Sequence, residues 1–148
     1  MAGKKQFSTF VVDGLLFGVE VEKVQEVIRY QEMTRVPLAP PMVKGLINLR
    51  GQIVTAIDLR RRLALRDRAA TDLPMNVVVR HDDGAVSLLV DEIGDVVEVD
   101  DQTFEPPPDT VDRQAREFIL GVHKLSGRLM HVLDSKKVVE VEKVNREL

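Results

Sequence analysis

The stretch Gly45–Arg60, GLINLRGQIVTAIDLR, contains two apolar runs separated by the short break Asn48-Leu49-Arg50-Gly51. Apolar and β-branched runs on both sides of a glycine-containing break predict two strands joined by a tight turn. Asp58 then precedes LRRRLAL, where its carboxylate is a good N-cap for a short helix. The open question is whether the charged break serves folding or a partner.

The same pattern returns later in the chain. Gly45–Arg60 aligns without gaps with GVHKLSGRLMHVLDSK at an offset of 76 residues. In this alignment Gly45, Leu49, Gly51 and Asp58 meet Gly121, Leu125, Gly127 and Asp134. VEKVQEVI (Val21–Ile28) likewise aligns with VDEIGDVV (Val90–Val97) at an offset of 69. An internal repeat of this kind predicts two similar lobes related by a pseudo-twofold axis.

The remaining segments predict a mainly β protein. Hairpins are expected around Asp13-Gly14 and Asp82-Asp83-Gly84, a helical turn leading into a strand at Val21–Ile28, and a loop at Pro37–Pro41. Sheets this small bury their edges by curling, so two five-stranded barrels with short helices are expected. The predicted boundaries within one domain, 1–148, are lobe one at about 7–65, a linker at about 66–74, lobe two at about 75–135 and a C-terminal helix at about 135–146.

Composition limits the function. The chain has 148 residues, of which 44% are hydrophobic and 30% charged, as in soluble globular proteins. It contains no cysteine, which excludes disulfides, thiolate nucleophiles and thiolate metal sites. No apolar run approaches the roughly 20 residues of a membrane span, so a cytosolic protein without membrane insertion is expected.

No residue pattern predicts catalysis, a cofactor or a metal. His81, His123 and His131 are not at a ligand spacing, and each is expected in a turn or on a strand surface. The five acids of Glu92–Asp101 do not match an EF-hand and fit a solvated strand face. A hydrolase built from these scattered groups has no supporting spacing, and we expect that the protein is not an enzyme.

Two basic features remain. Arg60-Arg61-Arg62, with Arg66, supports an alternative function as a nucleic-acid-binding small barrel, against the simpler interpretation of an exposed helix face. Arg50 occurs in only one repeat, because the equivalent residue is Ser126. Turn geometry explains Gly51 but not Arg50, so Arg50 is the better candidate for a partner contact.

The segments FVVDGLLFGVEVEKVQEVI, RVPLAPPMVKGLINLRGQIVTAIDLR and GRLMHVLD, in this order, resemble the CheW family of chemotaxis coupling proteins. The resemblance runs from about Phe7 to Val139 and is most specific in the N-L-R-G and I-D-L-R motifs. It implies two five-stranded SH3-like barrels and a free-standing, non-enzymatic adaptor. The implied partners are the cytoplasmic tip of chemoreceptors and the regulatory domain of the histidine kinase CheA, at receptor arrays beneath the inner membrane.

The resemblance also implies a coupling surface. The family's surface, carried over to this sequence, includes Val24, Glu26, Gly45, Asn48 and Arg50. Val27 and Leu49 could add apolar contacts to a receptor helix, and Arg50 could pair with partner carboxylates. Gly51, Asp58, Gly121, Gly127 and Asp134 are expected to be structural turns and caps. The sequence departs from the family at Thr55, His123 and His131, where proline, glycine and an aliphatic residue are common.

Overall fold

The computed structural model describes residues 3–82 and 84–140, and these are mainly β-strands. The elements are β1 Lys4–Val12, β2 Leu15–Glu20, the 3-10 turn η1 Val21–Lys23, β3 Val24–Ile28, β4 Val43–Leu49, β5 Gln52–Asp58, α1 Leu59–Arg62, β6 Met75–His81, β7 Gly84–Val90, β8 Glu92–Asp100, η2 Asp101–Thr103, β9 Phe104–Glu105, α2 Arg113–Arg116, β10 Ile119–Leu125, β11 Arg128–Leu133 and α3 Ser135–Val139. No helix in these ranges is long and apolar enough to cross a membrane.

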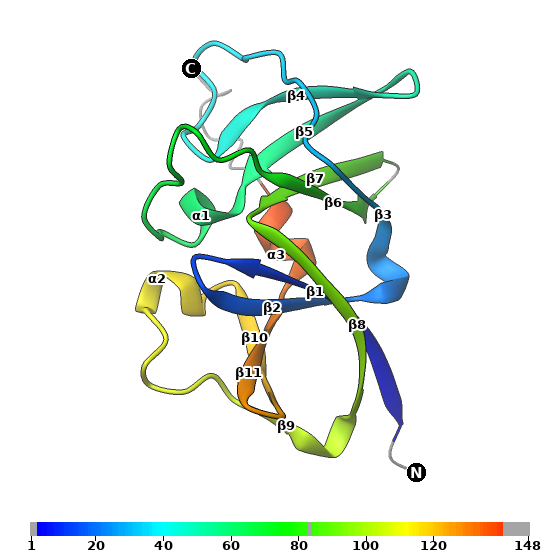
Figure 1. Ribbon diagram of the computed structural model, residues 1–148, viewed down its shortest axis with the longest axis vertical. Coiled ribbons are helices and arrows are strands. Elements are labelled where there is room, and N and C mark those ends of the chain that lie inside the picture. Colours follow the sequence, from blue (N-terminus) through cyan, green and yellow to red (C-terminus); the bar gives the residue numbers. More distant parts are fainter. Residues whose placement is uncertain (1–2, 83, 141–148) are drawn as a thin grey trace.

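The strands form two sheets, stacked as the upper and lower lobes of Figure 1. The lower sheet has the order β8-β1-β2-β11-β10-β9, and the upper sheet has the order β3-β6-β7-β5-β4. Each sheet contains one parallel pair, β2 with β11 and β5 with β7, and its other pairs are antiparallel. The expected mainly β, two-lobed fold is confirmed, although the lower sheet gains a sixth strand, the two-residue β9.

The internal repeat is visible in the strands themselves. β4 begins and ends 76 residues before β10, and α1 and α3 each follow an aspartate cap 76 residues apart. The sequence repeat therefore corresponds to a repeat of structure. It runs from β1 to α1 in the first copy and from β6 to α3 in the second.

The predicted lobe boundaries are wrong, because the two repeats exchange strands. The hairpin β1–β2 of the first repeat lies in the sheet of β8–β11, while the hairpin β6–β7 of the second lies in the sheet of β3–β5. The chain therefore crosses between lobes twice, at Glu20–Val24 and at Val90–Glu92. Chain order suggested contiguous lobes, but the pairings β1 with β8 and β3 with β6 are long-range and leave no local signal.

One hydrophobic core is shared by both lobes. Phe10 and Phe17 of the lower sheet pack with Ile57 and Leu88 of the upper sheet, and Val138 of α3 completes the cluster. All five side chains are fully or almost fully buried. Each lobe also has a smaller hydrophobic cluster of its own, one formed by residues of the upper sheet and one by residues of the lower sheet.

The C-terminal helix is shorter than the predicted 135–146. α3 ends at Val139, and Glu140 has extended backbone angles, with φ −74° and ψ 116°. The rest of the predicted helix lies outside the described residues. The linker at 66–74 contains no helix or strand, as expected, but it is tied to both lobes by the arginine contacts described below.

Candidate functional site

The break between β4 and β5 is a tight turn held by its own side chain. Arg50 and Gly51 both have positive φ, 49° and 88°, which is the geometry of a type I′ hairpin turn. The Asn48 Oδ1 accepts a hydrogen bond of 2.9 Å from the Gly51 amide. Asn48 therefore has a folding role here, and Gly51 is a structural turn residue as predicted.

Arg50 extends from this turn to Glu26 on β3. The guanidinium Nη2 and the carboxylate Oε2 form an ion pair, although Arg50 keeps 73% of its side chain exposed and Glu26 only 18%. β3 and β4 are the two edge strands of the upper sheet, so this pair joins elements that lie far apart in strand order. Two residues selected by the resemblance are thus in direct contact.

The apolar candidates divide into exposed and buried residues. Val27 is exposed, Val24 is half-buried and packs against the shared core, and Leu49 is buried at 7% exposure. Leu49 therefore faces the interior and does not provide the expected contact surface. Ile53 was missed: it is 61% exposed and pairs directly across from Asn48. Strict alternation with the buried Val54 and Ala56 could have identified it from sequence.

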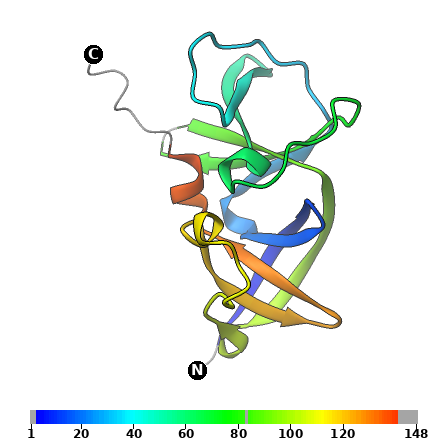
Figure 2. The same ribbon diagram turned by 90° about the vertical axis from the view of Figure 1, so that its left-hand side faces the viewer.

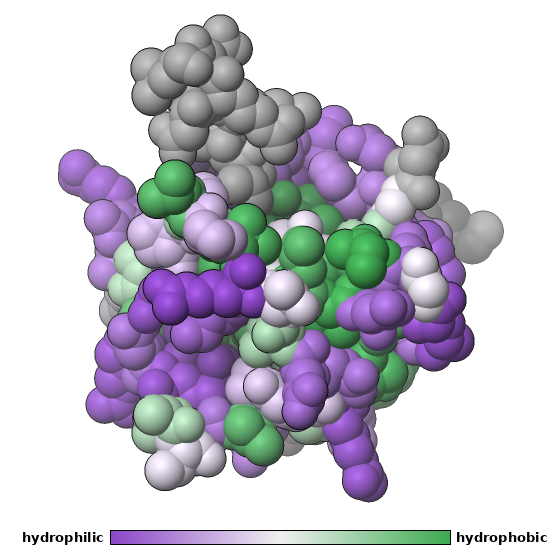
Figure 3. Space-filling model, turned by 90° about the horizontal axis from the view of Figure 1, so that it is seen from above, coloured by the Kyte–Doolittle hydropathy of each residue, from purple (hydrophilic) through white to green (hydrophobic). Residues whose placement is uncertain are grey.

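Apolar side chains gather at the end of the molecule that carries β4 and β5. Figure 3 shows a continuous green area in the middle and right of this view, with purple polar regions on either side. Leu38, in the loop before β4, and Ile53, on β5, are exposed large apolar residues of this end. An apolar surface with a polar rim is suited to docking an amphipathic helix.

Gly45 was expected to permit close approach of a partner, but the space beside its Cα is occupied by another segment of the same chain. A Cβ at Gly45 would lie 2.7 Å from the Thr34 carbonyl oxygen, where Thr34 forms a β-bridge with Leu46. Its counterpart Gly121 is crowded in the same way, with the Glu105 carbonyl oxygen 2.5 Å from such a Cβ. Both glycines therefore allow a neighbouring strand segment to cross closely, which is a folding role.

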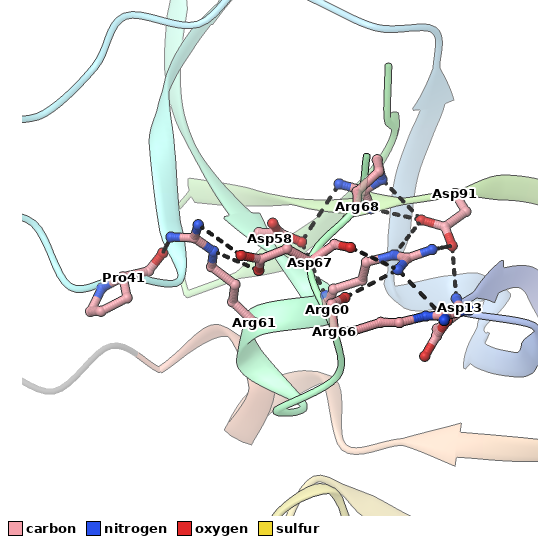
Figure 4. Close-up of polar contacts among 9 residues, drawn as sticks. All are labelled: Asp13, Pro41, Asp58, Arg60, Arg61, Arg66, Asp67, Arg68 and Asp91. Carbon is pink, nitrogen blue, oxygen red and sulfur yellow. Dashed lines mark hydrogen bonds and ion pairs between the residues drawn. The ribbon is translucent and has the colours of Figure 1, made fainter. Parts of the chain in front are cut away.

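Only Arg61 of the basic cluster is exposed, whereas Arg60 and Arg62 are half-buried. Figure 4 shows that Arg60 forms a fork with Asp91, at 3.1 Å and 2.7 Å, while Arg61 pairs with Asp67 at 3.1 Å. The Arg62 Nε donates to the Val138 carbonyl at 3.0 Å, and its guanidinium stacks over the Phe118 ring. All three arginines are engaged with the protein's own groups, which removes the basis for a nucleic-acid surface.

The two later histidines are buried, contrary to expectation. His123 lies between the rings of Phe7 and Phe104, and its Nδ1 is 2.9 Å from the Thr103 hydroxyl. The His131 Nδ1 donates to the Leu16 carbonyl at 2.9 Å. Only His81 keeps the expected place at the end of a strand. Within residues 3–82 and 84–140, no group of three or more histidine or acidic side chains could hold a metal ion.

The predicted caps are confirmed by geometry. The Asp58 side chain accepts from the Arg60 amide at 3.1 Å and caps α1. Asp134 accepts from the Lys137 amide at 3.0 Å and caps α3. Gly127, with φ 82°, occupies the turn between β10 and β11.

A family model for the CheW-like domain matches residues 6–143. The chain belongs to the CheW-like domain family. It is 33% identical over 133 residues to the chemotaxis protein CheW of Bacillus subtilis, covering 90% of this chain and 85% of that protein. It is 30% identical over 140 residues to the CheW of Rhizobium meliloti, covering 95% and 90%. The crystal structure of the scaffolding protein TtCheW from Thermoanaerobacter tengcongensis matches with a TM-score of 0.82 and 28% identity over 95% of each chain.

Proposed function

We propose that this CheW-like protein is a non-enzymatic cytoplasmic adaptor that couples chemoreceptors to the regulatory domain of a CheA-type histidine kinase. Membership of the CheW-like family supports the adaptor role, since its relatives are named chemotaxis proteins CheW and a solved relative is called a scaffolding protein. The observation that carries the assignment to this surface is the contact of Arg50 with Glu26. It joins the two segments that the family resemblance selects.

The proposed coupling surface consists of Val24, Glu26, Val27, Asn48, Arg50 and Ile53. Arg50 is largely exposed, so its remaining N–H groups can donate to a second carboxylate, supplied by a partner, beside Glu26. Val27 and Ile53 supply exposed apolar side chains on β3 and β5. This combination suits the helical tip of a receptor.

The test is calorimetric titration with the regulatory domain of a CheA-type kinase from the same organism, together with co-sedimentation with receptor tips. Wild-type protein is expected to bind both partners saturably. Arg50→Glu is expected to lose receptor binding and keep kinase binding, because it reverses the exposed charge. Absence of wild-type binding to every kinase of the organism contradicts the adaptor assignment.

A charge exchange separates a partner contact from a folding contact. In the double variant Glu26→Arg with Arg50→Glu, the internal ion pair is restored with reversed sign, but the charge offered to a partner stays reversed. Continued loss of receptor binding in the folded double variant places Arg50 in the interface. Recovery would show that Arg50 serves only to hold Glu26.

A further inference from the structure

A network of connected arginine–aspartate ion pairs lies away from the coupling surface, at one of the two crossings between lobes. Asp91 stands where the chain passes from β7 of the upper sheet to β8 of the lower sheet. It accepts hydrogen bonds from the fork of Arg60, from the Arg68 Nε at 3.0 Å and from the Asp13 amide at 2.7 Å, and the Arg68 Nη2 adds an ion-pair contact at 2.8 Å. Figure 4 shows these side chains converging on its carboxylate.

The cluster contains groups from both lobes and from the connecting segment. Asp13 belongs to the β1–β2 turn of the lower sheet, whereas Asp58 and Arg60 come from the end of β5 and from α1, beside the upper sheet. Arg68 comes from the connecting segment and lies 3.7 Å from Asp58, with 7% and 3% of these side chains exposed. The charges of the three aspartates are balanced by the largely buried Arg60 and Arg68 and by Arg66, which keeps 83% of its side chain exposed.

The other crossing has no such cluster. The repeat places Glu22, Asp82, Asp134 and Lys136 at the positions of Asp91, Asp13, Asp58 and Arg60. Among residues 3–82 and 84–140, no ion pair joins any of these four to another. Arg80 donates there to the Glu22 and Val24 carbonyls at 2.8 and 3.0 Å, and Lys5 and Lys23 pair with Glu20 at 3.3 and 4.0 Å. In Figure 1 the two crossings lie on opposite sides, β7–β8 to the left and η1–β3 to the right.

We propose that Asp91, Arg60, Arg68 and Asp13 form an inter-lobe clamp that fixes the angle between the two lobes and thereby positions β3. The shared core holds the lobes together but is not directional, so it permits them to slide. Forked charged hydrogen bonds are directional and set the angle. A surface hollow of about 670 Å³, lined by Arg60, Arg68 and Asp91 together with Val11 and Glu92, lies beside the clamp and leaves room for such movement.

The consequence is asymmetric. One crossing is clamped by largely buried ion pairs, whereas the other is held by the more exposed contacts of Arg80 and Glu20, so loss of the clamp turns the lobes about Glu20–Val24. β3 begins there and carries Val24, Glu26 and Val27. The clamp residues are therefore positioning residues for a surface that they do not touch. This link to partner binding rests on the proposed function, whereas the conformational role does not.

The absence of cysteine allows a direct test in the full chain. Spin labels at Lys44→Cys and Arg128→Cys, exposed positions in β4 and β11, report the distance between lobes by double electron–electron resonance. Asp91→Asn is expected to broaden and shift a narrow wild-type distance distribution. Hydrogen exchange at Val24–Ile28 is expected to accelerate roughly tenfold. Glu98→Gln, which removes an exposed carboxylate from β8, the strand that follows Asp91, is the matched control and should change neither.

Purely local damage gives a different result. Faster exchange confined to the β1–β2 turn and the start of β8, with an unchanged distance distribution, would overturn the clamp. Should Asp91→Asn fail to fold, Arg68→Lys keeps the charge but loses the fork and is expected to shift both readouts less, in the same direction. Receptor tips that bind wild type but not Asp91→Asn support the link to β3, and equal binding contradicts it. Failure of wild type to bind contradicts the proposed function alone.

Discussion

Gly45 and Gly121 were both given a folding role by the internal repeat, but Gly45 was also assigned to a partner surface, which the structure does not support. Their recurrence in the repeat predicted a folding role, while the family resemblance added Gly45 to a partner surface. The structure places the obstacles within the chain itself, at the Thr34 carbonyl for Gly45 and at the Phe104 ring and the Glu105 carbonyl for Gly121. The sequence could not reveal this, because the crossing segments lie 11 and 16 residues away without a strand pattern.

Gly121→Ala is therefore expected to destabilise the protein by about 1–3 kcal/mol, because the new Cβ must displace the Glu105 backbone as well as the Phe104 ring. Urea unfolding followed by circular dichroism measures this loss. Gly84→Ala is the control, since a Cβ there meets nothing within 4 Å, and its effect should stay within about 0.5 kcal/mol. Equal effects of the two substitutions would contradict the crowding argument.

His123 predicts a pH dependence of stability. Burial lowers the pKa of His123, nearby Asp101 raises it and Lys5 lowers it, with a net lowering from the ordinary value of about 6.5. The unfolded chain therefore binds a proton at a higher pH than the folded protein. The contribution of His123 to the free energy of unfolding is fully present above pH 6.5. It decreases as the pH falls from there through the pKa of the folded state, and below that pKa it no longer changes.

The measurement is urea unfolding at pH 7.5 and pH 5.5 for wild type and His123→Leu. We expect the wild type to lose more stability than the variant over this interval, because only the wild type carries the histidine whose pKa is lowered on folding. Comparison with the variant removes the contributions of His81 and His131, which both proteins share. Identical pH dependence in the two proteins would show that His123 accepts its proton without cost in the folded state.

At the scale of elements, the caps and turns were the most predictable features. Asp58 and Asp134 were predicted to be the N-caps of short helices. Each accepts a hydrogen bond from a backbone amide in the first turn of its helix. Cap and turn chemistry is local, so a few consecutive residues determine it. The burial of Arg60 and Arg62 was not predictable, because their partners Asp91 and Val138 lie 31 and 76 residues away.

The two caps should differ in energetic importance. Asp134→Ala is expected to cost about 1 kcal/mol, the usual value for a lost N-cap. Asp58→Ala should cost about 2–4 kcal/mol, because Asp58 is also buried and lies 3.7 Å from Arg68, whose charge would lose a neighbour. Thermal and urea unfolding of both variants measure the difference. Equal costs would mean that Asp58 acts as a cap alone.

For the whole molecule, the candidate site depends on long-range pairing that the sequence only partly encodes. The repeat predicted two lobes, and the family resemblance selected Glu26 and Arg50, but neither indicated that these residues form an ion pair. Glu26 reaches its place because β3 leaves the hairpin β1–β2 and pairs with β6 of the other repeat. The exchange of hairpins, rather than any local motif, assembles the surface.

This exchange makes a prediction about dividing the chain within the connecting segment. Residues 1–65 alone contain β1–β2 without β8 and β11, and β3–β5 without β6 and β7, so each sheet lacks its neighbours. Neither 1–65 nor 75–148 should show dispersed amide resonances in a two-dimensional NMR spectrum. An equimolar mixture should recover them, since the shared core and the strand pairs β1–β8 and β3–β6 re-form between fragments. Independent folding of residues 1–65 would instead indicate contiguous lobes and contradict the exchange.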